Sequence, residues 1–541
     1  MAVDGKADLV LKGGRVWCGL DLGAAEALAV KDGRVMAAGL ESEIEVLVGP
    51  ATEVIDLRGR LAMPGFYDAH MHLMSLGRAA QHINLRASEV NTLDGLLERV
   101  AARAAQTPPG DWFEGRGYDH TVFAESRHPQ RHELDQVAPD NPVWLGRCCG
   151  HMGVANSAAL KLAGIDRDTP QPDGGVIEKV NGEPTGLLQE RAQVLVRSKI
   201  PTPSLEDLMA AVQSAGERCL SYGITSVMDA CVGAHGGWRD VEAYEEAAAT
   251  GRLPVRMYMG IAGGPDGIAD QAYAKGRLTG TGNGRLTVGP IKFFTDGSAG
   301  GCTAAMRKPY SNGADGVLIL EDRDLDDMVA HYHDRGYQIA IHAIGDAAVD
   351  QTIQALDRAL ARLPRDNHRH RIEHCGWVDD ANIQRMIDLG LTPAPQPIFM
   401  RDFGDSYLNV LGEERSAWAY PMAHWQRVGL KPAMSSDTPV SDVNPFVNLY
   451  AALTRETSSG HVIGGDQALT LEEALSAYTE NGAHAGFAEN HRGRLSTGMA
   501  ADIAIVDRDI FERPAEELFE TEVDGTLMDG AFVFDRHQEF R

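Results

Sequence analysis

Two histidines at the end of an apolar run are the residues of this sequence best placed to do chemistry: His70 and His72, in PGFYDAHMHL, residues 64–73. On a β-strand, residues i and i+2 face the same side, so the two rings would lie about 7 Å apart, close enough to share one metal ion. The pair alone is equally compatible with two packed or surface histidines. Residues at the ends of later apolar runs favour the metal interpretation.

Those further candidates are Lys292, His342, His374 and Asp437, each at or near the end of such a run. Including the run that holds His70, there are eight short, mostly apolar runs, at residues 61–70, 224–230, 255–261, 291–294, 338–344, 370–375, 391–397 and 431–437. Catalytic groups of a (β/α)₈ barrel lie at the C-terminal ends of its strands, which is where these candidates would fall.

The segments between many of these runs are amphipathic, with apolar residues near helical spacing, as in 205–223, 324–336, 348–363 and 380–390, and several end on glycine. Strand and helix in alternation over eight units predict an α/β fold, a (β/α)₈ TIM barrel. The candidates would then lie on strands 1, 4, 5, 6 and 8.

This order of residues, H-x-H, Lys, His, His and Asp, resembles the amidohydrolase superfamily in its binuclear form. More narrowly, the sequence resembles the amidohydrolase 3 (YtcJ-like) group, which includes N-substituted formamide deformylases. The resemblance covers nearly the whole chain and rests on PGFYDAHMHL, NPVWLGRCCGHMGVANSAAL, GGVIEKVNGEPTGLLQE, IKFFTDGSAGGCTAAM, IHAIGDAAVD, RHRIEHC and SSDTPVSDVNPF.

The resemblance implies two divalent metal ions, expected to be Zn²⁺, with N6-carboxylated Lys292 as their bridge. Four histidines shared between two ions leave each ion short of ligands, so an anionic bridge is needed. Lys292 lies in a run that looks buried, VGPIKFF, where an unpaired ammonium would be costly. The alternative is that Lys292 pairs with Asp296 or caps a loop. The expected ligands are His70, His72, Lys292, His342, His374 and Asp437.

Two residues are candidates for catalysis. Asp437 would bind metal, accept a proton from the metal-bound water and deliver that proton to the leaving amine. The alternative is that it caps the turn that follows. His151, in a glycine-flanked turn, is the candidate donor to the substrate's carbonyl oxygen by analogy of position, and a turn histidine without a role is nearly as good an interpretation.

The expected activity is metal-dependent hydrolysis of a C–N amide bond, most concretely in an N-acyl or N-formyl amine. A hydrolytic deaminase of a ring amidine is the first alternative, although such enzymes usually use one metal and lack the strand 4 lysine. Esters, lactones and carbamates are also attacked by such sites. A scaffold without activity is disfavoured because every expected ligand type is present.

Domain organisation follows from the stretches outside the barrel pattern. Residues 1–63 and 488–541 contain alternating, hairpin-like strand segments, and in the resembling family the two chain ends form one small β-sandwich. Residues 64–487 would form the barrel. Residues 75–205, after strand 1, are too long for a βα connection and predict an inserted subdomain over the barrel mouth. The aromatic residues of this subdomain would either line the pocket against an apolar part of the substrate or form the subdomain's own core. They are Trp112, Phe113, Tyr118, Phe123 and Trp144.

Composition limits the partners. The net charge of −27 argues against nucleic acid and anionic membranes. Neither a secretory signal nor an apolar stretch of about 18 residues is present. Seven cysteines, an odd number without C-x-x-C spacing, indicate reduced thiols in the cytoplasm. We therefore expect a cytoplasmic enzyme for a small-molecule substrate with an apolar portion, and the sequence leaves a homodimer open.

Overall fold

The structure is a computed structural model that describes residues 5–86, 89–148 and 151–540. The chain divides into two compact units. One unit combines residues 1–76 with residues 212–541, and the other consists of residues 77–211. All the candidate metal ligands belong to the first unit, whereas His151 belongs to the second.

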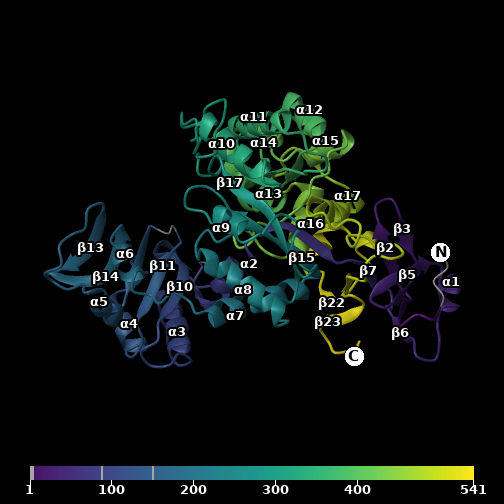
Figure 1. Cartoon of the computed structure of the whole chain (residues 1–541). Coiled ribbons are helices and arrows are strands. Elements are labelled where there is room, and N and C mark those ends of the chain that lie inside the picture. The colour runs from purple at the N-terminus through teal and green to yellow at the C-terminus, as the bar shows by residue number, and fades with distance from the viewer. Residues whose placement is uncertain (1–4, 87–88, 149–150, 541) are drawn as a thin grey trace. The chain divides into compact units, whose positions relative to one another are not determined.

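The first unit is built around a parallel sheet of seven strands (Figure 1). Each strand pairs in parallel with the next along the chain, and the rising order of the strands is that of a barrel. The strands are β8 (Phe66–Met71), β15 (Ile224–Val232), β16 (Arg256–Ala262), β17 (Leu286–Phe294), β18 (Ile339–Ala343), β19 (Arg371–His374) and β20 (Thr392–Ala394).

An extended segment, residues 432–437, closes the barrel between β20 and β8. Ala433 N–H donates to the Pro393 carbonyl at 2.9 Å, and on the other side Ala69 N–H donates to the Met434 carbonyl at 3.3 Å. The segment is not a regular strand because Pro393, Pro395 and Pro432 have no N–H to donate. It occupies the place of the eighth strand, so the predicted (β/α)₈ barrel is confirmed.

Some of the barrel helices begin at a side-chain cap that the sequence provides. In α12 (Asp380–Leu389) the Asp379 side chain accepts from Asn382 N–H, and Gly390 at φ 67° ends the helix as expected. The other helices that follow barrel strands are α8 (Trp238–Ala249), α9 (Ala269–Ala274), α10 (Asp322–His333), α11 (Asp346–Arg362), α13 (Ile398–Leu411), α14 (Glu413–Ala417), α15 (Met422–Arg427), α16 (Pro445–Thr454), α17 (Leu471–Ala477) and α18 (Glu480–Ala485).

The two chain ends meet in a six-stranded sheet, which contains β7 (Leu61–Pro64) from the N-terminal part and β21 (Ile503–Val506) from the C-terminal part as antiparallel neighbours. A four-stranded sheet from the N-terminal part contributes to the same apolar core. The remaining strands are β2 (Arg15–Gly19), β3 (Gly23–Ala25), β22 (Val523–Met528) and β23 (Ala531–Asp535) in the first sheet, and β1 (Leu9–Lys12), β4 (Ala27–Lys31), β5 (Arg34–Gly39) and β6 (Glu53–Asp56) in the second.

The second unit carries its own six-stranded sheet and its own apolar core. Its strands are β9 (Ile83–Asn84), β10 (Phe113–Tyr118), β11 (Val143–Arg147), β12 (Met152–Ala155), β13 (Gly175–Val180) and β14 (Glu183–Glu190), and its helices include α3 (Leu93–Ala104), α4 (Arg131–Val137), α5 (Ser157–Ala163) and α6 (Gln193–Arg197). The helices α2 (Leu73–Gln81) and α7 (Leu205–Ser221) lead into and out of this inserted unit.

Four of the five aromatic residues of the insert lie in its core: Phe113, Tyr118, Phe123 and Trp144 are all buried. Trp112 is half-buried and packs against the apolar cluster that contains Trp144. Of the two interpretations left open by the sequence, these contacts favour the core. The six cysteines in the described part of the chain are free thiols, and Cys149 lies outside it.

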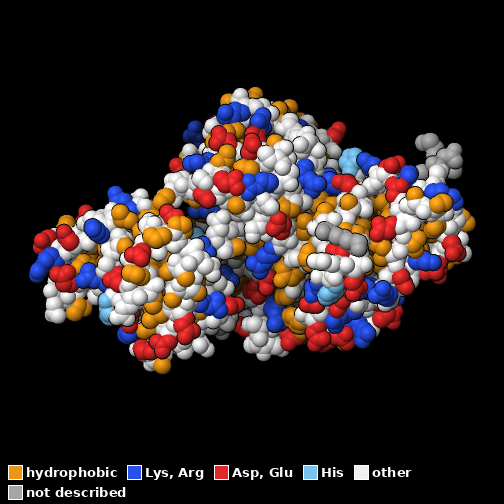
Figure 2. Space-filling view, turned by 90° about the horizontal axis from the view of Figure 1, so that it is seen from below, with side chains coloured by type: hydrophobic (Ala, Val, Ile, Leu, Met, Phe, Trp, Pro, Cys, Tyr) orange, Lys and Arg blue, Asp and Glu red, His pale blue; other side chains and the backbone are white. Residues whose placement is uncertain are grey.

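The surface carries both signs of charge. On the face shown in Figure 2, acidic and basic side chains are interspersed with apolar ones. Among the described residues, no helix is both long enough and apolar enough to cross a bilayer.

Candidate metal centre

The C-terminal ends of the barrel strands hold the candidate ligands in their expected order. His70 lies in β8, and His72 follows directly after that strand, before α2. His342 lies in β18, and His374 is the last residue of β19. Because parallel strands end at one rim of the barrel, these residues from distant parts of the chain are brought to the same place.

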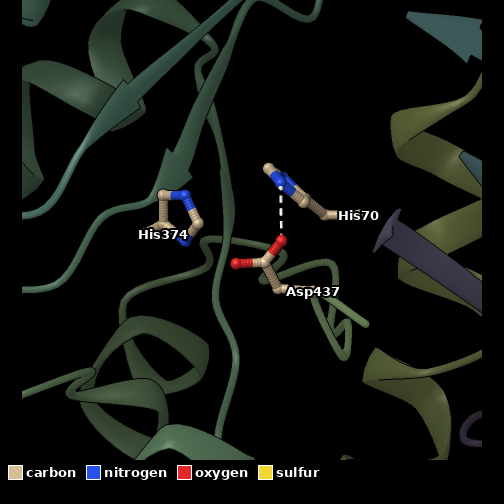
Figure 3. Close-up of side chains that lie close together, drawn as sticks. All are labelled: His70, His374 and Asp437. Atoms are coloured by element: carbon tan, nitrogen blue, oxygen red, sulfur yellow. Dashed lines mark ion pairs between the residues drawn. The ribbon is translucent and has the colours of Figure 1, made fainter. Parts of the chain in front are cut away.

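Three of the side chains form a tight, buried cluster: His70, His374 and Asp437 each offer a ligand atom, and these atoms lie within 4.8 Å of one another. Figure 3 shows the Asp437 carboxylate directed toward the ring of His70, with the ring of His374 facing the same space. His72 joins them, because its Nε2 lies 3.2 Å from Asp437 Oδ1. The rings of His70 and His72 have their centres 5.6 Å apart.

The donor atoms fit a divalent metal ion. Two ligands of one tetrahedral ion, each about 2.1 Å from it, lie about 3.4 Å apart. The Asp437 Oδ1 atom lies 3.4 Å from His70 Nε2 and 3.2 Å from His72 Nε2. Although both nitrogens are close, Oδ1 is buried without a hydrogen-bond partner of good geometry. A buried carboxylate oxygen in that condition is costly, and a cation would satisfy it.

Lys292 is 1% exposed, and its Nζ lies 4.5 Å from the centre of the Phe294 ring. No described residue forms a hydrogen bond or an ion pair with this ammonium. Asp296, the alternative partner, accepts instead from the backbone N–H groups of Ile344 and Gly345. The lysine is therefore buried beside the cluster without the acidic partner that the alternative interpretation requires.

His342 belongs to the same region but is oriented differently. The centre of its ring lies 4.4 Å from that of His374. Its Nε2, however, lies 3.0 Å from the Gly297 carbonyl and 3.3 Å from Asp296 Oδ1. His342 is thus adjacent to the cluster but not among the three residues whose ligand atoms converge most closely.

The outer nitrogens of the histidines have partners that the sequence analysis missed. Glu373 Oε2 contacts His70 Nδ1, and Gln396 Oε1 lies 2.7 Å from His374 Nδ1. Asp229 Oδ1 lies 4.0 Å from His72 Nδ1. A hydrogen-bonded outer partner, as His70 and His374 have, fixes the tautomer and the orientation of a ligating ring. The distance at His72 is too long for a hydrogen bond. The one available signal was position, since Glu373 and Asp229 both lie at the C-terminal ends of strand-like runs.

Backbone conformation also contributes to the cluster. His374 has φ 66° and Asp437 has φ 55°, both in the left-handed region that residues other than glycine rarely adopt. Conformations of this kind cost free energy and are concentrated at functional sites, where the surrounding structure holds them.

The side chains of the cluster perturb one another strongly. Burial lowers the pKa of His374 well below its ordinary value, and the neighbouring His342 and His70 lower it further. Burial alone would raise the pKa of Asp437, but the rings of His70 and His72 hold it well below its usual range. Burial and Lys292 lower the pKa of His70, while Glu373 and Asp437 raise it more. Neutral imidazole and ionised carboxylate are the forms that bind metal.

His151, the candidate oxyanion donor, lies in the inserted unit, with 68% of its side chain exposed. Its Nδ1 is 3.2 Å from Glu190 Oε2. Nothing in this local geometry tests its role toward the substrate, which stays a prediction.

Comparisons with known proteins match almost the whole chain. The profile of the "Amidohydrolase family" matches residues 53–534. The putative amidohydrolase YtcJ of Bacillus subtilis is 32% identical over 533 residues, 97% of this chain and 99% of that protein. An N-substituted formamide deformylase from Arthrobacter pascens is 31% identical over 522 residues, 95% of each chain.

A solved structure is similar over almost the same length. The crystal structure of an uncharacterized metal-dependent hydrolase from Pyrococcus furiosus superposes with a TM-score of 0.76 at 29% identity, covering 93% of this chain and 99% of that chain. The family profile and these relatives match nearly the whole length of the chain, and the solved structure has the same fold. The chain therefore belongs to the amidohydrolase family of metal-dependent hydrolases.

Proposed function

We propose that the protein hydrolyses the C–N bond of an N-acyl or N-formyl amine with the help of two divalent metal ions, expected to be Zn²⁺. The observation that carries this proposal is the approach of His70 Nε2 and His72 Nε2 to Asp437 Oδ1, a buried oxygen without a hydrogen-bond partner. The similarity to an N-substituted formamide deformylase supports the choice of bond.

Six residues are proposed to hold the two ions: His70, His72, Lys292, His342, His374 and Asp437. Lys292 would take part as a carbamate, formed when its neutral amine adds carbon dioxide and releases a proton. The burial of this lysine without an acidic partner supports the proposal, because carboxylation replaces a costly ammonium with an anion that two cations can neutralise.

Bound metal would supply a water of lowered pKa and polarise the substrate carbonyl. In this scheme Asp437 accepts a proton from the attacking water and delivers it to the leaving nitrogen. The oxygen of the water ends on the acyl carbon, the C–N bond breaks, and the products are a carboxylic acid, or formic acid, and an amine. His151 is proposed as a hydrogen-bond donor to the carbonyl oxygen.

The substrate is proposed to be a small molecule with an apolar portion. Phe294 supports this choice, because it is 42% exposed at the end of β17 although it is a large apolar residue. Its ring centre lies 5.5 Å from that of His342. The inserted segment, about residues 75–205, is proposed to adjust which amides are accepted, and residues 1–63 with 488–541 to form a separate composite β-sandwich.

The decisive experiment combines metal analysis with a substrate panel. The purified protein is expected to contain about two metal ions per chain, as in other two-metal sites. It should release the free amine and the acid from amides with varied acyl and amine halves, with N-formyl amines among the best substrates. Release of ammonia from ring amidines by a protein with one ion would instead identify a deaminase and refute the proposal.

A further inference from the structure

A buried ion pair contacts the cluster of candidate ligands. Arg371 and Glu373, both in β19, are completely buried. Arg371 Nε donates to Glu373 Oε1 at 2.6 Å, and its Nη2 donates to Glu373 Oε2 at 3.0 Å. Glu373 Oε2 in turn contacts His70 Nδ1. The described residues thus form a continuous chain from a guanidinium, through a carboxylate, to a candidate ligand.

This chain crosses the interior of the barrel. In the order of the sheet, β19 is separated from β8 by β18, β17, β16 and β15 on one side. On the other side lie β20 and the closing segment, residues 432–437. Arg371 makes a second contact with β8, because Nη2 also donates to the Ala69 carbonyl at 2.7 Å. The side chains of one strand therefore hold both the ring of His70 and the backbone just before it.

The contact also selects one form of the His70 ring. An ionised carboxylate only accepts hydrogen bonds, so Nδ1 must carry the proton and Nε2 keeps its lone pair, on the side of Asp437. Both carboxylate oxygens of Glu373 accept from the Arg371 guanidinium, which is the pairing expected of an ionised carboxylate.

His374 offers a contrast within the same cluster. Its Nδ1 faces Gln396 Oε1, and the Gln396 amide group donates to the Ala394 carbonyl and to Ser435 Oγ. Both histidines therefore direct Nε2 inward, but only His70 is backed by a charged group. A carboxylate behind a ligating imidazole increases its basicity more than a neutral amide does.

We propose that Glu373, held in place by Arg371, is a positioning residue that orients His70 and strengthens it as a metal ligand. This inference rests on the proposed function, because it assumes that His70 binds metal. In the R-I-E-H part of RHRIEHC, only His374 was a candidate ligand. The inference gives this segment a second role, which is to orient His70.

The first test is Glu373→Gln, which keeps the length of the side chain but removes its charge. Metal affinity, measured by competition with a chelator, is expected to fall about 10- to 100-fold. Glu489→Gln is the matched control, because Glu489 also forms an ion pair with an arginine, Arg369, but contacts no candidate ligand. Its metal affinity should equal that of the wild type.

The second test separates positioning from folding. Replacing a buried ion pair with apolar residues is often neutral for stability, whereas removing one partner is not. The double variant Arg371→Met with Glu373→Leu should therefore keep the unfolding midpoint of the metal-free protein close to wild type and still bind metal weakly. A purely structural pair would give wild-type metal affinity in this variant.

The outcomes distinguish this inference from the proposed function. If the wild type binds metal and both Glu373 variants bind it equally well, Glu373 does not position His70, although the proposed function stands. If the wild type binds no metal, both fail together. Loss of metal affinity in both variants, with the Glu489→Gln control unchanged, supports the inference.

Discussion

Glu373 and His374 are consecutive residues, and both contact the ring of His70. Glu373 Oε2 meets its Nδ1, and the centre of the His374 ring lies 4.9 Å from the centre of the His70 ring. Successive residues of a regular strand face opposite sides, so a strand that continued through His374 would separate them. The left-handed backbone at His374, φ 66°, ends the strand and allows both side chains to contact the same ring.

Replacing Lys292 with alanine should lower both bound metal and turnover, by at least the roughly 10- to 100-fold that loss of an outer partner of a ligand costs, because the bridging anion is lost. Short carboxylic acids added to the assay should restore part of both by taking its place. Metal per chain and initial rates, with and without added acid, give the measurement. Lys275→Ala is the control, since Lys275 also lies over an aromatic ring, that of Trp238, but on the surface. Full activity and two ions in Lys292→Ala would show that the lysine is structural.

Asp437→Asn should keep the fold while reducing kcat by about 10²- to 10⁴-fold, since an amide cannot accept the proton of the attacking water. Circular dichroism checks the fold, and steady-state kinetics with a formamide substrate measure the loss. The exposed neighbour Asp442 provides a control, because Asp442→Asn removes a carboxylate five residues away. A loss smaller than about tenfold would assign proton transfer to another group.

His151→Ala should reduce kcat by on the order of 10²-fold if the ring donates to the developing oxyanion. Metal content should not change, because no proposed ligand lies in the inserted unit. His132→Ala, a change at an exposed histidine of the same unit without an assigned role, controls for general effects. Loss of a metal ion would make His151 a ligand, and wild-type kinetics would leave the insert no part in the chemistry.

A set of three buried histidines away from the cluster predicts loss of stability in acid. His333 Nε2–H donates to the Leu363 carbonyl, and His370 Nε2–H donates to His333 Nδ1. His370 Nδ1 accepts from Ile339 N–H, while His368 lies between the Leu389 carbonyl and the N–H of His370. Every ring nitrogen has a partner that suits the neutral ring, so an added proton would break a hydrogen bond.

Burial lowers the pKa of His368 to about 4, and it also lowers those of His333 and His370. In the unfolded chain these histidines titrate near about 6.5. Between these values the unfolded state binds more protons, so stability is complete above about pH 6.5 and falls as the pH decreases toward 4. Urea unfolding of the metal-free protein at several pH values measures the slope. His368→Gln should flatten it, whereas His132→Gln should not, and equal slopes in wild type and His368→Gln would contradict the assignment.

The sequence was sufficient for the barrel because apolar runs and amphipathic segments alternate, and this pattern depends only on periodicity and caps. The pair His70 and His72 could be found for the same reason, since spacing on a strand fixes the side of both rings. The contact of both Glu373 and His374 with one ring could not be found, because neighbours on a regular strand face opposite sides and no local pattern specifies the left-handed angle at His374. The orientation of His342 could not be predicted either, because its Nε2 faces the Gly297 carbonyl, which belongs to a loop distant in the sequence.

The closing segment shows a further limit of sequence patterns. Prolines at 393, 395 and 432 leave it without a regular ladder, although it takes the place of a strand. Residues 431–437 were predicted to be a strand as one of the eight runs, and the hydrogen bonds that join the segment to both neighbours are fewer than a regular strand would make.

Asp437 N–H donates to the His70 carbonyl at 2.8 Å, so the residue that completes the cluster also joins the last barrel segment to the first strand. The two partners leave the ribosome at very different times, and a nascent chain that stops before Asp437 has neither a closed barrel nor a full ligand set. With the ligands proposed above, a complete metal site would therefore form only after synthesis has passed this point.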